Sequence, residues 1–363
     1  MSKFFNVLLL PGDGIGVEVT AAARKVLEAA AAKEAVDLKF ETRLVGGACY
    51  DDCGEFLTDE TLQLARDSDA VLFGSEGGPK WDSLDLNWPP ERRSGLTRLR
   101  RQLQLFANLR PIRPLDCLIE RSTLKSDVIR GVDFIILREL CGGIYFGEPR
   151  GIGRGPDGEM RGFETQIYTE SEIVRVSRVA FNLARQRRKK VTSVEKSNVM
   201  ESGFFWRQVI TRVGREEFPD VELEHMYADN AAMQIVRQPK QFDVLVTDNL
   251  FGDLLSDCAA MITGSLGMLP SASLAAPELN GKQLGLYEPI HGSAPDIAGK
   301  GIANPIGSIL SAGMLARHSL KNSKIAQSIE KAVESVLASG IRPSDLGGTA
   351  STADMTENVL QRL

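Results

Sequence analysis

Short apolar runs alternate along the chain with segments whose apolar residues recur at helical spacing. Residues 7–10, 38–42 and 70–73 are strand-like segments, whereas residues 17–33 and 58–66 have the period of amphipathic helices. Because the two kinds of segment follow each other in turn, the pattern predicts an α/β fold whose parallel strands are buried between helices.

Three irregular stretches interrupt this alternation. Residues 74–96 are rich in Gly, Pro and Trp, and a loop of that length inside a compact domain is usually functional. Residues 148–162 are rich in Gly and Pro with mixed charge, which indicates an exposed hairpin or arm. Residues 270–281 are expected to be a further connector, so the breaks after Pro114 and at 270 could bracket a middle domain.

Composition and charge narrow the class of protein. The 363 residues are 43% hydrophobic and 25% charged, which is ordinary for a soluble globular protein, and no apolar run is long enough for a membrane span. The formal net charge of −5 gives no general affinity for nucleic acid or for anionic membranes. Five cysteines without a CxxC pair favour reduced thiols, and the N-terminus has no signal-peptide pattern, so a cytoplasmic location is expected.

Two aspartates lie one helical turn apart in residues 247–257. A buried strand is predicted over 242–247 and a helix over 250–261, so the carboxylates of Asp253 and Asp257 share one helix face. Their mutual repulsion would be offset by a divalent cation with oxygen ligands. The alternative is a pair of solvated surface carboxylates.

Three arginines stand at the ends of predicted elements. A helix over 96–106 would place Leu96 and Arg100 one turn apart, and this pair suits a ligand with both an alkyl group and a carboxylate. Arg110 precedes a proline, and Arg138 ends an apolar strand. Together they could bind two carboxylates, although each alone could equally be an ordinary ion-pair arginine.

Candidate groups for proton transfer and for a third metal ligand follow further strands. Tyr145 lies in a Gly-rich turn and Lys196 directly follows a predicted strand. A lysine close to a cation can act as a general base. Asp229, at a predicted helix start, could be a helix cap or an oxygen ligand.

A Gly- and Pro-punctuated loop over residues 288–305 suits a nucleotide. His291 offers a ring for stacking, and Asp296 suits ribose hydroxyls but would repel a 2′-phosphate, which favours NAD over NADP. The earlier turn over residues 11–16 lacks the GxGxxG spacing, so no Rossmann pyrophosphate loop is predicted there.

These motifs together resemble the isocitrate/isopropylmalate dehydrogenase family of metal-dependent β-decarboxylating dehydrogenases, over nearly the whole chain. Residues 247–257 and 291–305 have the pattern of the whole family, and residues 105–111 and 138–147 that of its isopropylmalate branch. The resemblance implies NAD-dependent oxidative decarboxylation of (2R,3S)-3-isopropylmalate to 2-oxo-4-methylpentanoate and CO2 in leucine biosynthesis.

The family's architecture is implied as well. It is an α/β fold with a large, open mixed sheet, isopropylmalate dehydrogenase-like and not Rossmann, in two interleaved domains. Residues 1–106 plus 270–363 would form the NAD-binding domain. Residues 107–269 would form a middle domain with the metal site, the arm and the interface of a homodimer whose active sites are shared between subunits.

The resemblance assigns roles residue by residue. Arg100, Arg110 and Arg138 would bind the substrate carboxylates, Leu96 would contact the isopropyl group, and Lys196 and Tyr145 would transfer protons. Mg²⁺ or Mn²⁺ would be held by Asp253 and Asp257 with the partner subunit's Asp229, which would also contact substrate; Lys196 would come from the partner too. The residues implied for NAD are Ile15, Gly78, His291, Gly292, Ser293, Ala294, Asp296, Ile297 and Asn304.

Three positions depart from the family pattern. Glu76 stands where a small or apolar residue is usual, Glu91 is displaced from the usual acidic position before Gly95 and Leu96, and Ser94 matches the isocitrate branch. Sister activities on isocitrate, homoisocitrate or D-malate are therefore alternatives, although Leu96 favours an alkyl group. Phosphoryl transfer is disfavoured because no GxxxxGK[ST] loop is present. A catalytically silent paralogue is disfavoured because Lys196 and Tyr145 are retained.

Overall fold

Buried strands and amphipathic helices form where the alternation of the sequence predicts them. The computed structural model describes residues 3–84 and 88–363. Contacts divide the chain into two units. Unit 1 comprises Met1–Leu105, Arg113–Arg130 and Ala260–Leu363, and unit 2 comprises Phe106–Ile112 and Gly131–Ala259. Each unit contains α-helices and a mixed set of strands, so the expected open α/β fold is confirmed; the domain boundaries expected from the sequence stay a prediction.

Unit 1 contains five strands in the order β2-β1-β3-β12-β11. Neighbouring strands are parallel except for β11, which runs antiparallel to β12. This order differs from the 3-2-1-4-5-6 order of a Rossmann fold. The strands are β1 Lys3–Gly12, β2 Val36–Thr42, β3 Ala70–Ser75, β11 Pro270–Leu274 and β12 Gly285–Pro289.

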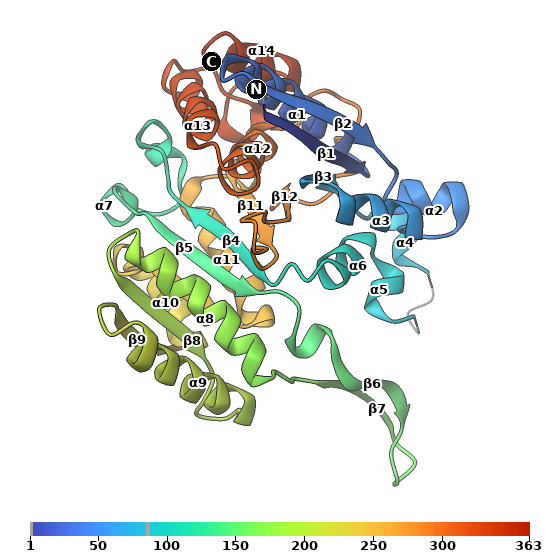
Figure 1. Ribbon diagram of the computed structural model, residues 1–363, viewed down its shortest axis with the longest axis vertical. Helices are drawn as coiled ribbons and strands as arrows, with labels where there is room; N and C mark the ends of the chain where they lie inside the picture. Colours follow the sequence, from blue (N-terminus) through green and yellow to red (C-terminus); the bar gives the residue numbers. More distant parts are fainter. Residues whose placement is uncertain (1–2, 85–87) are drawn as a thin grey trace. The chain divides into compact units, whose positions relative to one another are not determined.

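Helices α1, α12, α13 and α14 of unit 1 pack together (Figure 1). The larger helices are α1 Gly16–Lys33, α3 Asp59–Asp67, α6 Gly95–Gln102, α12 Ile306–His318, α13 Ser323–Ala338 and α14 Thr352–Leu360. The shorter ones are α2 Gly47–Cys53, α4 Pro79–Asp82, α5 Pro90–Arg93, α7 Ser126–Ile129, η1 Asp116–Arg121, η4 Met261–Thr263, η5 Leu266–Met268 and η6 Ser344–Leu346.

The larger set of paired strands in unit 2 has the order β4-β5-β10-β8-β9, and within it only β4 is antiparallel to its neighbour β5. These are β4 Ala107–Ile112, β5 Phe134–Glu139, β8 Lys190–Glu195, β9 Glu222–Tyr227 and β10 Val244–Thr247. Its helices are η2 Gly143–Tyr145, α8 Glu170–Arg185, α9 Glu201–Glu217, α10 Ala228–Arg237, η3 Pro239–Gln241 and α11 Asn249–Ala260.

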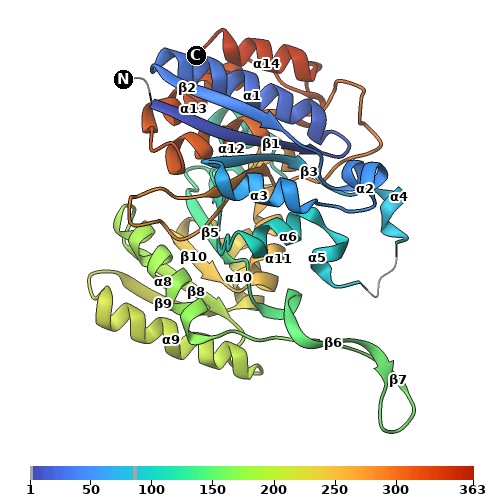
Figure 2. The same cartoon turned by 45° about the vertical axis from the view of Figure 1, so that its right-hand side comes forward.

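The expected arm is confirmed. Strands β6 Gly147–Arg154 and β7 Met160–Thr165 form a separate antiparallel pair that extends away from the other strands of unit 2 (Figure 2). A two-stranded hairpin alone is at best marginally stable in water. The arm's isolation is therefore consistent with a surface that is completed by another protein.

Three expectations about local structure were wrong in part. The expected connector over 270–281 begins with strand β11, whose residues are all buried in the pairing with β12. The irregular stretch 74–96 contains the four-residue helices α4 and α5, and its residues 85–87 lie outside the described part. Helix α6 ends at Gln102 and does not include Phe106, because Gln104 adopts a left-handed φ of 52°.

Candidate active site

Helix α11 of unit 2 carries both metal-site aspartates and begins in a network of hydrogen bonds. The Asp248 carboxylate accepts a bond from the Phe251 backbone N–H at 2.8 Å, which caps the helix. The Asn249 backbone N–H donates to the Tyr168 hydroxyl at 2.9 Å, and the Asn249 side-chain amide donates to the carbonyls of Leu140 and Gly142. The first turn of α11 is therefore fixed relative to the segment that follows β5.

Arg138, at the end of β5, lies across this helix. Its Nε donates to the Asn249 side-chain oxygen at 2.9 Å, and its Nη1 donates to Asp253. A Cβ added at Gly252 would lie 2.6 Å from the Arg138 side chain, so only glycine admits this close approach. The Arg138 side chain is 3% exposed, and such a guanidinium needs the carboxylate beside it.

Arg110 on β4 approaches the same helix one turn later. Its Nε donates to Asn108 at 2.9 Å and its Nη1 donates to the Ser256 hydroxyl at 2.5 Å. Its guanidinium also lies 3.7 Å from Asp253 and 3.5 Å from Asp257. Two of the three arginines predicted for the substrate carboxylates therefore meet the predicted metal-site acids.

Tyr145, in η2, completes the surroundings of Asp253. Its hydroxyl donates to Asp253 Oδ2 at 3.0 Å. Burial, and then the Asp253 charge, raise the pKa of Tyr145, so the phenol stays protonated at neutral pH and can donate a proton. Tyr145, Arg138 and Asp253 belong to three separate sequence motifs, and the structure brings all three together.

Asp257 differs from Asp253 in its exposure. Its side chain is 63% exposed, against 36% for Asp253. Partial burial raises the pKa of Asp257, Arg110 opposes that shift and Asp253 adds to it. A bound divalent cation would favour the ionised form of both carboxylates, and hard oxygen ligands with open neighbouring positions fit Mg²⁺ or Mn²⁺.

The third predicted ligand, Asp229, lies elsewhere in unit 2. It is near the start of α10, and its Oδ1 accepts a bond from Lys196 Nζ at 2.5 Å. That hydrogen bond lowers the pKa of Asp229. Across residues 3–84 and 88–363 no group of three His, Cys, Asp or Glu side chains could hold a metal. The chain thus presents one pair of acids, Asp253 with Asp257, and separately one ion pair, Asp229 with Lys196.

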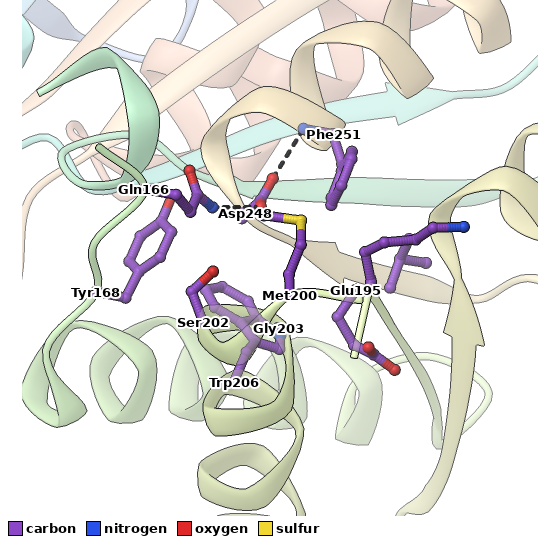
Figure 3. A pocket seen from close by; sticks show the side chains of 11 residues that line it. Gln166, Tyr168, Glu195, Met200, Ser202, Gly203, Trp206, Asp248 and Phe251 are labelled. Carbon is purple, nitrogen blue, oxygen red and sulfur yellow. Dashed lines mark hydrogen bonds between the residues drawn. The ribbon is translucent and has the colours of Figure 1, made fainter. Parts of the chain in front are cut away.

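A small cavity of about 10 Å³ lies beside Lys196, with room for about one water (Figure 3). On one wall Gln166 Nε2 donates to Asp248 at 2.9 Å. Burial raises the pKa of Asp248 to about 6. Met200, which precedes α9, and Trp206 of α9 also line the cavity. The segment that carries Lys196 is therefore packed close to the capping residue of α11.

In unit 1, the loop after β12 contains most of the residues predicted for NAD. The Ile15 N–H donates to the Ser293 carbonyl at 2.8 Å, which ties this loop to the start of α1. Ile15 and Ala303 are buried in one apolar cluster, against which Ala294 and Ile297 pack. Gly292 and Asp296 are exposed, and Gly78 immediately precedes α4.

The side chain of His291 indicates that this loop can bind a ligand. Its Nδ1 lies 2.9 Å from the Gly292 carbonyl, and its buried Nε2 has no hydrogen-bond partner within the described chain. Burial lowers the pKa of His291, so the ring is neutral and suited to stacking. Asn304 instead uses its side chain locally, on Asp345 at 2.9 Å and on the Ile306 N–H at 3.0 Å.

Helix α6 of unit 1 carries the remaining substrate candidates. Leu96 is half-buried in its first turn, and Arg100 follows one turn later with its Nη2 2.7 Å from Glu288. Glu91 pairs with Arg101 at 2.7 Å, away from the helix start. Ser94 caps the helix by accepting a bond from the Thr97 N–H at 3.0 Å.

Several residues that shape these sites were not identified from the sequence. Asn249 and Tyr168 hold the start of α11, and Glu288 holds Arg100. Asn249 stands inside the Thr-Asp-Asn segment that the sequence singled out, so its position gave a signal. Glu288 is the first residue of the predicted nucleotide loop, but its pairing with Arg100 could not be predicted, because the two are far apart in the sequence. Tyr168 gave no signal, because its contact with Asn249 also joins distant segments.

The chain is similar to a known family and to curated relatives over nearly its whole length. The family model described as isocitrate/isopropylmalate dehydrogenase matches residues 6–359. Two curated relatives are 3-isopropylmalate dehydrogenases. The one from Ruegeria pomeroyi is 56% identical over 99% of this chain and 98% of its own length, and the one from Caulobacter vibrioides is 57% identical over 99% of both.

Two solved structures are similar throughout. Isocitrate dehydrogenase from Methylococcus capsulatus has a TM-score of 0.86 and 33% identity, covering 99% of each chain. A β-decarboxylating dehydrogenase from Thermococcus kodakarensis has a TM-score of 0.79 and 36% identity, covering 99% of this chain and 96% of the other.

Proposed function

Because the chain belongs to the isocitrate/isopropylmalate dehydrogenase family, we propose that it catalyses the oxidative decarboxylation of (2R,3S)-3-isopropylmalate to 2-oxo-4-methylpentanoate and CO2, a step of leucine biosynthesis. The geometry that carries the proposal is the arrangement around Asp253, where Arg138, Arg110 and the Tyr145 hydroxyl converge. Such a site combines an anion-binding pair, a proton donor and metal-ligand chemistry.

Substrate recognition divides among the arginines and Leu96. Arg110 and Arg138 are held by Asn108, Ser256 and Asn249, so their guanidinium groups are oriented before any ligand arrives. We assign them, with Arg100, to the two carboxylates of the malate core. We assign Leu96 to the isopropyl group, since a polar substituent there would lose its hydrogen bonds.

Proton transfer is assigned to Lys196 and Tyr145. In the proposed reaction Lys196 accepts the proton of the C2 hydroxyl as the C2 hydride leaves, and Tyr145 protonates C3 after loss of CO2. The raised pKa of Tyr145 keeps the phenol protonated for that step. The bond from Lys196 to Asp229 holds the amine in place.

Enzymes of this family use a nucleotide cofactor and a divalent metal, and we propose NAD and Mg²⁺ or Mn²⁺. The metal, held by Asp253, Asp257 and the partner subunit's Asp229, would supply Lewis acidity toward the C2 oxygen and the carboxylate beside it. NAD⁺ would supply the hydride acceptor, with Asp296 on the ribose and the neutral His291 ring near the adenine. The residues proposed to line its site are Ile15, Gly78, Gly292, Ser293, Ala294, Ile297 and Asn304.

A homodimer is part of the proposal. Large apolar side chains are exposed on unit 2, on the arm and on or beside α9, α10 and α11, and a partner subunit that covered them would remove them from water. They are Ile152, Met160, Phe163, Val199, Phe204, Met233, Val236 and Leu254. With two acids on α11 and a third beside Lys196, each chain would complete its partner's site. Sedimentation equilibrium should give twice the mass of one chain.

A cytosolic location is proposed from the thiols. All five cysteines are free, which is the usual state of thiols in a reducing compartment. In the described residues, no helix has the length and apolarity to cross a membrane.

The test of the proposed function is NADH absorbance with Mg²⁺ and a panel of acids. We expect turnover of 3-isopropylmalate to exceed that of isocitrate and D-malate, and NAD⁺ to exceed NADP⁺. Faster turnover of isocitrate or D-malate would refute the substrate, and reduction of neither cofactor with any acid would refute the enzyme class.

A further inference from the structure

Glu76, just after β3, binds the first turn of α6 through both of its carboxylate oxygens. Oε1 accepts from the Gly95 N–H at 2.6 Å, and Oε2 accepts from the Leu96 N–H at 3.0 Å and from the Ser94 hydroxyl at 2.8 Å. The first backbone N–H groups of a helix have no partner within the helix. One carboxylate therefore satisfies two of them and also the hydroxyl of the capping residue.

The rest of α6 is fixed by packing in the core of unit 1, and this restrains its first turn. Leu99 and Leu103 are buried in the core cluster of unit 1. A Cβ at Gly95 would lie 2.5 Å from the Phe56 carbonyl oxygen, so the helix start lies directly against that backbone. Glu76 thus binds the part of α6 from which Leu96 projects, one turn before Arg100.

The backbone next to Glu76 is itself fixed by hydrogen bonds to Asp13. The Asp13 carboxylate accepts bonds from the N–H groups of Gly47, Ala48 and Gly77, each at 2.8 Å, and Gly77 is the residue that follows Glu76. Burial raises the pKa of Glu76 and the nearby Asp13 charge adds to that shift, while the three donors from residues 94–96 favour the ionised form. Glu76 is thus a half-buried acid whose two carboxylate oxygens both accept hydrogen bonds from the start of α6.

We propose that Glu76 is a positioning residue for substrate recognition: by binding the amides of Gly95 and Leu96, it sets where Leu96 and Arg100 lie for an alkyl-substituted malate. The inference rests on the proposed function, because the ligand of Leu96 and Arg100 is the one assigned there. A carboxylate suits this task, since it accepts every bond, favours the positive end of the helix dipole and has no N–H to oppose the donors.

Glu76→Gln tests the proposal with almost no change in size. The amide nitrogen would face an N–H donor, so the first turn of α6 should loosen. We expect amide exchange at Gly95 and Leu96 to accelerate by about 10-fold, as for loss of one charge-assisted bond. The KM for 3-isopropylmalate should rise about 10-fold with the KM for NAD⁺ little changed, and the preference over D-malate should fall.

Asp354→Asn is the matched control. Asp354 also accepts bonds at a helix start in unit 1, from the Ser351 N–H at 3.0 Å and the Ser351 hydroxyl at 2.7 Å, but its helix α14 carries no proposed site residue. We expect it to leave both KM values and the preference unchanged. If Glu76→Gln fails to fold, Ser94→Ala removes one donor to Glu76 and should give the same shift, smaller in size.

The outcomes separate this inference from the proposed function. An unchanged KM for 3-isopropylmalate in folded Glu76→Gln, equal changes in both KM values, or the same effect from Asp354→Asn would overturn the positioning role. A wild-type protein with no turnover of any acid would refute the proposed function instead. In that case amide exchange at Gly95 and Leu96 still decides whether Glu76 holds the helix start.

Discussion

Helices α6 and α11 carry residues of the proposed site in different ways. On α11 the key groups are in direct contact. The Asp253 carboxylate accepts hydrogen bonds from Arg138 and from the Tyr145 hydroxyl, and it lies 3.7 Å from the Arg110 guanidinium. On α6 the key groups are a half-buried leucine and an arginine, and a single carboxylate, Glu76, holds the helix start. Removing a carboxylate from α11 should therefore leave the charge of the neighbouring arginines unbalanced. A change at the start of α6 should instead shift the positions of Leu96 and Arg100.

The largest effect is expected on α11. Asp253→Asn leaves the Arg138 guanidinium, 3% exposed, without its carboxylate and removes a proposed metal ligand. We expect kcat/KM to fall at least about 10³-fold. The free energy of unfolding should fall by about 1–3 kcal/mol, less than for a fully buried pair because Asp253 is 36% exposed. NADH rates and thermal unfolding measure both.

Asp257→Asn is the control within the same helix. Its side chain is 63% exposed and lies 3.5 Å from Arg110, so metal affinity should fall without a comparable loss of stability. Wild-type rate and metal affinity in Asp253→Asn would contradict the assignment of the metal site.

On α6 the expected effect is smaller and specific to the alkyl group. Leu96→Ala removes the proposed contact with the isopropyl group, so kcat/KM for 3-isopropylmalate should fall by about 10- to 100-fold while that for D-malate stays nearly constant. Leu279→Ala, at an exposed leucine of unit 1, is the control. Equal losses with both acids would show that α6 does not read the alkyl group.

The smallest effect at neutral pH concerns a histidine at the end of α12 in unit 1. Burial first, and then Arg317 and Lys321, lower the pKa of His318 from 6.5 to about 4. Between these values the unfolded chain binds a proton that the folded chain does not, so this contribution to stability is complete above pH 6.5 and is lost as the pH falls toward 4. In His318→Gln the free energy of unfolding should therefore fall less between pH 6.5 and pH 4 than in the wild type, by up to about 3 kcal/mol.

Denaturant unfolding at pH 7, 5.5 and 4 measures the effect. His225→Gln gives the parallel experiment in unit 2, where burial and Arg207 also lower the pKa of His225 to about 4. An unchanged pH dependence in either variant would show that its histidine does not limit acid stability in that unit.

Much of the local structure around helix α11 and in the arm can be predicted from the sequence. Strand β10, helix α11 with Asp253, and the hairpin arm were predicted, because each has a clear spacing of apolar residues or clear turn residues. Strand β11 was missed because its Pro-Ser-Ala-Ser composition resembles a connector, and only pairing with β12 makes it a strand.

The site was predictable to a similar degree. Residue types and positions at element ends singled out Arg110, Arg138, Tyr145 and Asp253, which the structure brings together. The role of Glu76 was not predictable, because its bonds to Gly95 and Leu96 join residues 19 and 20 positions apart. The sequence showed it only as an unusual acid with no visible partner.

In the proposed reaction this chain couples oxidation of 3-isopropylmalate to loss of CO2. The most direct measurement is the yield of NADH and of 2-oxo-4-methylpentanoate in one reaction with NAD⁺ and Mg²⁺. Equal yields, with D-malate turned over far more slowly, are the predicted result. NADH formed without the decarboxylated keto acid, or no NADH from 3-isopropylmalate, would contradict the claim.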